Sequence, residues 1–352
     1  MTQMWTMGLS HPSVVRRLAT TAEEAGWDGM LVVDSQNLSG DPYVGLALAA
    51  TATTKLGLGT GVTNPATRHP AAAAAAIGSI QVASGGRAVL GIGRGDSALA
   101  HLGLAPAPVA DLEQYVRLLR AYLRGERIPF DALTPYHRDG ARPLTDLGLA
   151  DAPDDSRLTW LSERLPPVPV EVVATGPRVL RVAAANADRV LLAVGADLDR
   201  VAWAVDQVRS INADVPIGAF VNVVAHPDVA TARRLGAGGL ATFARFSVMD
   251  GRVRTPTDER SREQLERIHA AYDMNHHTQS ASGQAATLDD NFADRFGILG
   301  PAGHCVERLQ HLAALGIDRF IVIGASIDAD RTEAERSRAT IVAEVLPALQ
   351  AG

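Results

Sequence analysis

Short apolar runs alternate with helical segments along the first hundred residues, and this alternation constrains the fold more than any other feature. Asp28–Val33 (DGMLVV) is a continuous apolar run, which is typical of a parallel strand covered on both faces. Ser13–Ala25, by contrast, spaces its apolar residues at helical intervals and stops at Gly26. Four strand-then-helix units in succession predict a parallel sheet with covering helices.

The same pattern resumes in the second half of the chain. We predict strands at Met4–Leu9, Asp28–Val33, Leu56–Val62, Ala88–Gly93, Val168–Ala174, Arg189–Val194, Ile217–Val224 and Phe320–Ile323, with a short strand-like run at Phe296–Leu299. A doubly wound sheet is the rival arrangement. Eight units with no domain linker favour closure into a (β/α)8 TIM barrel, which needs about 250 residues before insertions. Residues 1–352 are therefore predicted to form a single barrel domain.

Two stretches interrupt the pattern. Residues 125–167, after a predicted helix at Leu112–Arg124, are polar and contain several prolines. Residues 236–291, after a predicted helix at Val229–Leu235, are expected to be irregular, with some helix around Arg262–Tyr272. Both are too long for ordinary connections. We expect two insertions over the C-terminal mouth of the barrel, where they would carry the determinants of substrate choice.

Composition excludes several classes of function. The net charge is −6, from 33 basic and 39 acidic residues, and no basic block is present to bind nucleic acid. The only cysteine is Cys305, which excludes an intrachain disulfide and a thiolate zinc cluster. No apolar stretch is long enough to cross a membrane, and the N-terminus does not resemble a signal peptide. These features predict a cytoplasmic protein with no membrane or nucleic-acid partner.

Active sites of barrels lie just after the strands, at their C-terminal ends. The candidates are Asp34-Ser35, Gly61–Asn64, Gly93–Asp96, Thr175-Gly176, Gly195-Ala196, Asn222 and Gly324. Within Lys55–Pro70 (KLGLGTGVTNPATRHP), glycine removes the Cβ atoms that would keep a large flat ligand away from the backbone. We interpret Gly61–Asn64 as the floor of a cofactor site. The alternative is that these glycines only allow a helix to pack on the barrel.

Thr175-Gly176-Pro177-Arg178 has the features of an anion site. Pro177 suits the first position of a helix, and the free backbone N–H groups beyond it attract negative charge. Thr175 could add a hydroxyl donor and Arg178 a positive charge. An ordinary helix cap is the alternative reading.

Five segments resemble the bacterial-luciferase-like superfamily, and within it the branch that uses the deazaflavin coenzyme F420, typified by methylene-tetrahydromethanopterin reductase. The segments are GTGVTNPATRHP (Gly59–Pro70), SGGRAVLGIGRGD (Ser84–Asp96), AEEAGWDGMLVVD (Ala22–Asp34), Ala174–Ala196 and Asn291–Val322. The resemblance implies an insertion-bearing barrel with a cis peptide bond, Gly61–Val62 here, behind the flavin-type ring. It also implies that the turns at Thr175 and Gly195-Ala196 hold the phosphate and side chain of the coenzyme.

From the resemblance we expect a defined set of site residues. The cofactor-binding set is Thr60, Gly61, Val62, Asn64, Ala174, Thr175, Gly176, Arg178, Gly195 and Ala196; the catalytic candidates are Asp34, Ser35 and Asp96. Asp96 is equally suited to cap the next helix. Sugar-dehydrogenase relatives carry a histidine and a glutamate where this chain has Ser35-Gln36 and Arg94, so their acid/base pair is missing. Met7-Gly8-Leu9 also lacks the acidic residue of the pterin reductase, which argues against a pterin substrate.

These observations predict an F420-dependent oxidoreductase that transfers a hydride between the deazaflavin C5 and a small molecule. Because the acid/base pair is absent, reduction of an already electrophilic C=C or C=N bond is favoured. An FMN-dependent luciferase-like monooxygenase and a non-catalytic flavin- or deazaflavin-binding protein are the alternatives. His276-His277 lack ligand spacing, so no metal is expected. Ala71–Ala76 could form a close helix contact across a homodimer, although compositional bias explains it equally well.

Overall fold

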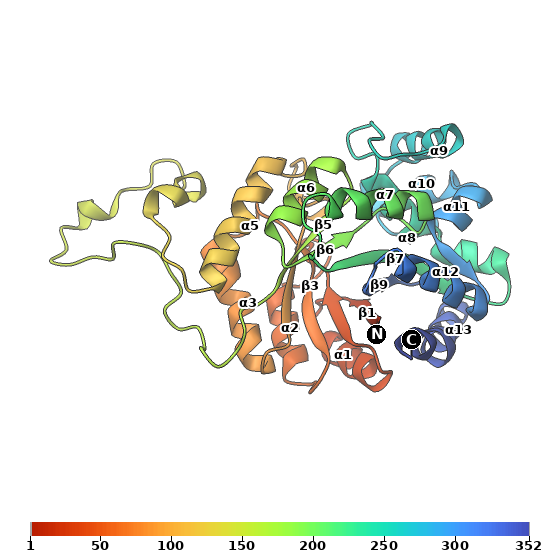
Figure 1. Cartoon of the computed structure of the whole chain (residues 1–352), viewed down its shortest axis with the longest axis horizontal. Coiled ribbons are helices and arrows are strands. Elements are labelled where there is room, and N and C mark those ends of the chain that lie inside the picture. Colours follow the sequence, from red (N-terminus) through yellow and green to blue (C-terminus); the bar gives the residue numbers. More distant parts are fainter. Residues whose placement is uncertain (1, 352) are drawn as a thin grey trace.

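A closed barrel of parallel strands forms the centre of the protein. The computed structural model describes residues 2–351, and within them eight strands pair in the order β1-β2-β3-β4-β5-β6-β7-β9, with β9 returning to β1 (Figure 1). These strands are β1 Gln3–Gly8, β2 Gly29–Val32, β3 Gly57–Thr63, β4 Ala88–Ile92, β5 Val170–Ala174, β6 Arg189–Leu192, β7 Ile217–Ala225 and β9 Arg319–Ile323. The predicted (β/α)8 fold is confirmed.

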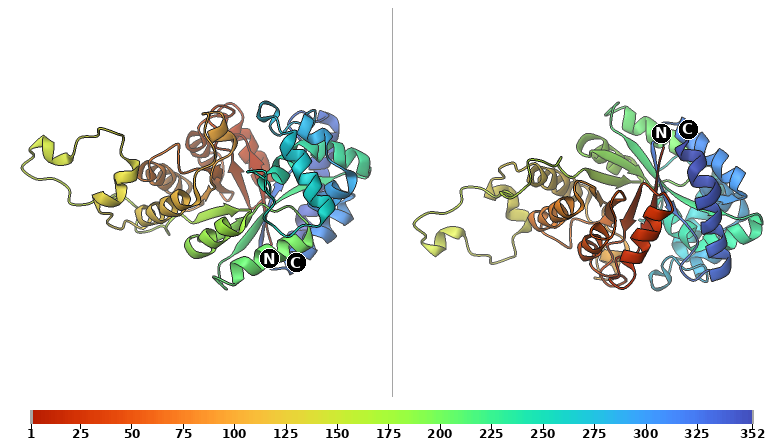
Figure 2. Two further views of the ribbon diagram at one scale, coloured as in Figure 1. Left: turned by 90° about the horizontal axis from the view of Figure 1, so that it is seen from above. Right: turned by 90° about the horizontal axis from the view of Figure 1, so that it is seen from below.

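Helices surround the barrel and cover the outward faces of its strands (Figures 1 and 2). The outer layer consists of α1 Val15–Glu24, α2 Pro42–Ala50, α3 Pro70–Ser84, α5 Val109–Leu123, α6 Pro177–Asn186, α7 Leu198–Arg209, α12 Ala302–Ala314, α13 Arg331–Thr340 and α14 Leu346–Gln350, with the short α4 Ser97–Ala100 after β4. Every residue of β2, β4 and β7 is buried, as expected for strands covered on both faces.

The lower part of the barrel interior is filled. Trp5, Leu31, Val89, Leu191, Phe220 and Ile321 form one buried layer. Below it, the guanidinium of Arg319 lies 4.3 Å from the centre of the Trp5 ring and 2.5 Å from the Glu171 carboxylate. This end of the barrel is therefore a packed core, and ligands can enter only from the opposite end.

The run predicted as strand-like at Phe296–Leu299 lies outside the barrel. β8 Ile298–Gly300 pairs with the last residues of β7, Val223–Ala225, while β9 takes the eighth barrel position beside β1.

The helix predicted at Val229–Leu235 is much longer than expected. α8 spans Val229–Phe246 and crosses the C-terminal mouth, where the Phe243 ring lies 5.7 Å from that of Phe220. The prediction was wrong because glycine disfavours isolated helix, whereas here tertiary contacts override that propensity. Gly239 is one such contact, since a Cβ there would come within 2.8 Å of the Asn222 amide nitrogen.

The rest of the second insertion is irregular with interspersed helices, and the helix expected around Arg262–Tyr272 is present as α9 Glu259–Ala270. It also contains α10 Gly283–Ala286 and α11 Asp290–Phe296, and all three helices contact α8. The backbone N–H groups of Ser280 and Ala281 donate to the Asp328 carboxylate at 2.6 and 2.9 Å. The insertion is thus anchored over the mouth, as predicted.

The first insertion does not lie over the mouth, which corrects the prediction. Residues 125–167 leave the end of α5 and return to the start of β5, at the N-terminal ends of the strands. They carry only two 3-10 turns, Phe130–Tyr136 and Leu144–Leu147, and extend away from the barrel beyond α3 and α5 (Figures 1 and 2). The reason is topological, because a helix-to-strand connection in such a barrel lies at the end opposite the mouth.

Replacing Gly238 by alanine is expected to loosen the second insertion. The new Cβ would lie 2.6 Å from the backbone carbon of Gln279, so helix and loop must separate. Overpacking of this kind costs about 1–3 kcal/mol of unfolding free energy, which denaturant titration measures. The control is Gly303→Ala on α12, where a Cβ meets open space and a small gain is expected. Equal stability of Gly238→Ala and the wild type would contradict this packing.

Candidate active site

Partly buried apolar side chains form a floor at the mouth of the barrel. Met7 on β1, Val62 on β3, Val173 on β5 and Ile323 on β9 lie on top of the buried interior layer, and Phe243 joins them from α8. They pack on the buried layer of Trp5, Leu31 and Phe220 and are less buried than it. A flat aromatic ligand could rest on this floor at the C-terminal ends of the strands.

β3 bulges beside this floor. The Gly61–Val62 peptide bond is cis, as predicted, and the register against β4 shifts between Thr60 and Thr63. A Cβ at Gly61 would lie 2.6 Å from Leu31 Cβ. The position therefore needs glycine for steric reasons, whatever binds above it.

Two other predicted residues of β3 are turned inside the protein. The Thr60 side chain is completely buried, and its hydroxyl donates to the Gly91 carbonyl oxygen at 2.7 Å. The Thr60 side chain is therefore occupied inside the protein, and a contact of this residue with a ligand would have to come from its backbone. Asn64 is 1% exposed and its Oδ1 accepts from the backbone of Ala66 and Thr67 at 3.0 and 3.1 Å. Asn64 shapes the turn after the bulge.

The predicted anion site at the start of α6 has mixed support. Gly176 precedes α6, Pro177 is at its first position, and in the described chain no side chain caps this end. Arg178 is exposed, whereas Ala174 is buried. The Thr175 hydroxyl donates to the Ala193 carbonyl at 3.2 Å, so it is not free to donate to an anion. Free backbone N–H groups and Arg178 remain as the anion-binding elements.

Further positive charge gathers at this rim. Arg94 follows β4 and donates to the carbonyl oxygens of Ala107 and Pro106 at 2.6 and 3.3 Å. Burial lowers its pKa, and the nearby charges of Arg178 and Arg254 act in the same direction, while Asp250 opposes them. Mutual repulsion of three guanidinium groups would be relieved by a bound anion. The sequence analysis mentioned Arg94 only because relatives carry a glutamate at that position, and it did not identify Arg254.

Gly195-Ala196 is covered by the second insertion. A Cβ at Gly195, which has a φ of +81°, would lie 2.7 Å from the Phe296 ring. The Ala196 N–H donates to the Phe296 carbonyl at 2.8 Å, and both residues are buried. The expectation that this turn contacts a coenzyme is therefore not supported, because α11 occupies the space above it.

Asp34 does not face the floor. Leu31 points into the barrel, so strand alternation turns Asp34 outward, where it is 7% exposed beside Tyr43 and Thr63. Burial raises its pKa, and the Thr63 hydroxyl and the charge of Arg68 oppose this rise. Ser35 is less buried, and its hydroxyl lies 2.8 Å from that of Ser97. Neither residue is placed as a proton donor at the mouth.

Asp96 is held by an ion pair across the mouth. One carboxylate oxygen pairs with Arg245 on α8, and within residues 2–351 the other is buried without a partner. Although Asp96 immediately precedes α4, its side chain does not cap that helix. The ion pair instead joins the loop after β4 to the end of α8, so Asp96 positions the roof of the mouth.

Tyr272 and His277 lie beside the Asp96–Arg245 ion pair, and together these four residues form a wall of the mouth. The sequence analysis did not identify Tyr272 or His277 as site residues. The Tyr272 oxygen lies 2.8 Å from His277 Nδ1 and 3.3 Å from the Thr242 hydroxyl, and Arg245 lies over the Tyr272 ring at 4.6 Å. Burial raises the pKa of Tyr272 to about 12 and lowers that of His277. The sequence signal that could have indicated this site was His277, but the sequence analysis considered that residue only as a metal ligand.

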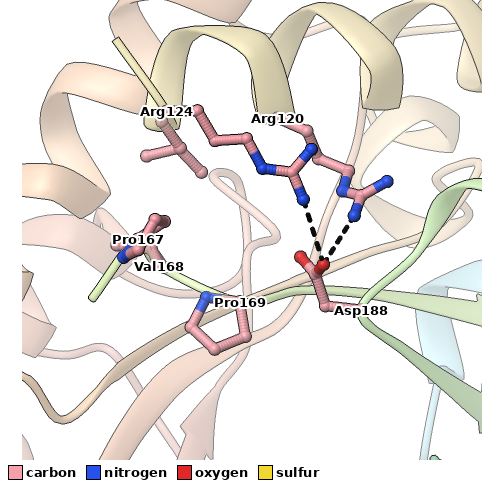
Figure 3. A pocket seen from close by; sticks show the side chains of 7 residues that line it. Arg120, Arg124, Pro167, Val168, Pro169 and Asp188 are labelled. Atoms are coloured by element: carbon pink, nitrogen blue, oxygen red, sulfur yellow. Dashed lines mark hydrogen bonds and ion pairs between the residues drawn. The ribbon is translucent and has the colours of Figure 1, made fainter. Parts of the chain in front are cut away.

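A separate cavity of about 340 Å³ lies at the opposite end of the barrel, between the end of α5 and the start of β5. Figure 3 shows Arg120 and Arg124 pointing toward Asp188, at 2.6 and 3.6 Å. The other Asp188 oxygen accepts from the Val170 N–H at 2.9 Å. These contacts hold α5 to the sheet, although two guanidinium groups share one carboxylate and, within residues 2–351, the buried Arg120 Nε has no partner.

Two classes of site find no support in the part of the chain that is described. Residues 2–351 contain no group of three or more His, Cys, Asp or Glu side chains placed to hold a metal ion. None of their helices combines the length and apolar character that crossing a membrane requires.

Asp34→Asn is expected to raise the melting temperature near neutral pH and to change it little below about pH 3.8. Because the folded pKa of Asp34 is raised, its stabilising contribution is complete below its unfolded pKa and is lost as pH rises through the folded pKa. Asparagine stays neutral throughout. Calorimetry of both proteins across this pH range checks the prediction, and a difference that does not grow with pH would contradict it.

The sequence matches one protein family over most of its length and is similar to several reductases of known name. The luciferase-like monooxygenase family model matches residues 2–319. The 5,10-methylenetetrahydromethanopterin reductase of Archaeoglobus fulgidus is 27% identical over 341 residues, 94% of this chain and 93% of that protein. The protein of the same name from Methanolobus tindarius is 37% identical over 119 residues, 33% of this chain and 36% of that one.

A solved structure shares the fold over its whole length. The coenzyme F420-dependent tetrahydromethanopterin reductase from Methanopyrus kandleri superposes with a TM-score of 0.70 at 22% identity, covering 98% of each chain. This agreement supports the fold, and the family match over residues 2–319 shows the family. The chain belongs to the luciferase-like monooxygenase family.

Proposed function

We propose that this protein is an F420-dependent oxidoreductase that transfers a hydride to or from a small organic substrate, and that it reduces an electrophilic C=C or C=N bond. One observation carries the proposal. An open apolar floor beside a glycine bulge lies next to a rim of Arg94, Arg178 and Arg254. This is the combination that a flat ring with an anionic tail requires. The likeness to reductases named for F420 supports it.

The residues fit the coenzyme in two ways. Gly61 and Val62 offer a surface without protruding polar groups for the back of the ring, and the start of α6 with its arginines offers a site for phosphate. Bound there, the deazaflavin would supply the hydride at C5. The protein's contribution is to exclude water and to hold ring and substrate face to face.

We assign the handling of the proton on the substrate side to Tyr272, because its hydroxyl is linked to His277 beside the mouth. Its hydroxyl is protonated at neutral pH, as for any tyrosine, and burial raises its pKa further, to about 12. When the Tyr272 oxygen gives that proton to the substrate, the neutral His277 ring would relay a replacement: its Nδ1, at 2.8 Å, gives a proton to the Tyr272 oxygen while its Nε2 takes one from solvent water. Arg245, held by its ion pair with Asp96, packs on the Tyr272 ring and would fix its orientation. This pair takes the role first assigned to Asp34, Ser35 and Asp96.

The FMN-dependent monooxygenase remains the second candidate, since the family as a whole carries that name. Both activities use the same floor and the same rim. A non-catalytic binding protein is the third candidate, and it would retain the coenzyme without turnover.

A homodimer is part of the proposal. α2 and α3 are apolar almost all round, yet Val44 and Val82 on their outer faces are half exposed. Helices of this kind are normally covered on every side. A second copy would cover them without needing a different partner.

Anaerobic titration tests the proposed cofactor. Reduced F420 should bind the purified protein and be reoxidised on addition of cyclohex-2-enone or 1-pyrroline as electrophilic probes. Reduced FMN is the matched comparison, with oxygen consumption as its readout. Binding of reduced FMN with no binding of F420 would overturn the proposal in favour of the monooxygenase, and binding without turnover across a wider panel would favour the third candidate.

Arg178→Ala is expected to weaken F420 binding about 10- to 100-fold, because a charge-assisted hydrogen bond to phosphate is lost. Fluorescence titration of the coenzyme measures the dissociation constant. Arg181→Ala, an exposed arginine on the same helix, is the matched control and should change binding little. If the two variants weaken binding equally, only the general charge of α6 matters.

Tyr272→Phe is expected to lower kcat for reduction about 100- to 10,000-fold, the range typical of general acid catalysis, while F420 affinity stays unchanged. Stopped-flow absorbance of bound coenzyme gives both values. The control is His276→Gln, since His276 is exposed and pairs only with its neighbour Asp273 at 2.7 Å. A Tyr272→Phe protein with normal kcat would remove Tyr272 from the mechanism.

A further inference from the structure

The cavity at the closed end of the barrel carries more positive charge than its own residues balance. It has a volume of about 340 Å³ and lies between the end of α5 and the start of β5. Its lining combines four apolar and three charged residues: Leu123, Pro167, Val168 and Pro169, with Arg120, Arg124 and Asp188 (Figure 3). Two guanidinium groups therefore share a single carboxylate.

Asp188 does not satisfy both arginines. One of its carboxylate oxygens lies 2.6 Å from Arg120 Nη2 and 3.6 Å from Arg124 Nη2, while the other accepts from the Val170 N–H at 2.9 Å. The longest of these separations is beyond hydrogen-bond range. Within residues 2–351 the buried Arg120 Nε also has no partner, and buried donors of this kind are rare because they give up their hydrogen bonds to water. Guanidinium donors are thus left over on both arginines.

No second acid of the described chain pairs with these arginines. Among the ion pairs within residues 2–351, Arg120 and Arg124 occur only with Asp188. Glu171, near the start of β5, is already paired with Arg319 at 2.5 Å. Since the described chain does not supply the missing negative charge, an external anion is the simplest source of it.

The cavity is open to a ligand from solvent. The Arg124 side chain is 44% exposed, and Pro167 and Pro169, which line the same cavity, are exposed as well. Its volume is at the small end of the range typical of ligand sites, whose walls are mostly apolar with a few charged groups. Leu123 and Val168 are buried and supply such a wall. The cavity therefore suits a small organic molecule better than a bare inorganic ion.

We propose that this cavity is a second ligand site, which binds a small monocarboxylate with an apolar body. Two guanidinium groups and one carboxylate leave one positive charge, which a monocarboxylate neutralises. A phosphate monoester carries a charge of about −1.5 to −2 at pH 7 and would leave the site negative. The ligand carboxylate would accept from Arg124, and a small rotation of Arg120 would give its Nε an acceptor. The inference does not depend on the proposed function, because the mouth lies at the opposite end of the barrel.

A ligand-observed NMR titration of the full chain, without coenzyme, tests the site. Phenylacetate is the probe, and its dissociation constant should be on the order of millimolar, as expected for so small a ligand. Phenylacetamide, its neutral isostere, should bind at least about 10-fold more weakly because the charge-assisted hydrogen bonds are lost. Phenyl phosphate should also bind more weakly than phenylacetate. Equal binding of acid and amide, tighter binding of phenyl phosphate, or no saturable binding of phenylacetate would overturn the inference.

Two variants locate the bound probe. Arg124→Gln removes a guanidinium that makes no close contact with an acid, so the fold should persist while phenylacetate binding weakens at least about 10-fold. Arg127→Gln is the matched control, because Arg127 is 67% exposed, lies just after α5 and pairs with Asp155 outside the cavity. Circular dichroism checks that both variants are folded. Equal affinities of the two variants, or a loss of binding in Arg178→Ala instead, would place the probe elsewhere and overturn the inference.

Asp188→Asn provides an independent test in the opposite direction. The variant keeps a side-chain oxygen that can accept from the Val170 N–H, but it removes the internal charge that competes with the ligand. Phenylacetate should therefore bind about 10-fold more tightly to the folded variant. An unchanged or weaker affinity would contradict the proposed role of the two arginines. None of these measurements uses F420, so a failure of the proposed activity would leave them interpretable.

Discussion

The rest of the structure depends on where the barrel interior is filled and where it stops. The Arg319–Glu171 ion pair and the layer around Trp5 close the lower end completely. Above them, Met7, Val62, Val173 and Ile323 reach the surface because the strands end there. A ligand thus meets an apolar floor rather than a channel, and every polar group that acts on it must come from loops or from α8.

α8 provides those groups because its successive faces have different tasks. Gly239 and Phe243 press on the barrel, and Gly238 and Thr242 face the second insertion. Arg245, near the end of the helix, reaches Asp96 after β4. α8 therefore fixes Tyr272 and His277 relative to the barrel through Thr242 and Arg245. Neither of these two residues lies next to a barrel strand in the sequence.

Local patterns in the sequence were sufficient to predict most of the strands and the barrel, whereas the cis bond at Gly61–Val62 was expected only from the family resemblance. They could not reveal α8, because its glycines are explained only by neighbours distant in sequence. The orientation of Asp34 could have been predicted from strand alternation. The position of the first insertion could have been predicted because it connects a helix to the next strand. The wall at Tyr272 could not have been predicted, because it forms only when residues from three separated segments meet.

The anchoring of the second insertion has a consequence for which of its residues tolerate substitution. The loop that carries His277 is tied to Asp328 through backbone N–H groups of Ser280 and Ala281, and these contacts do not depend on which side chains the loop displays. Ser280 and Ala281 can therefore change without breaking these two bonds. The buried Gln284 side chain, which donates to the His276 carbonyl oxygen at 3.0 Å, restricts substitution elsewhere in the loop.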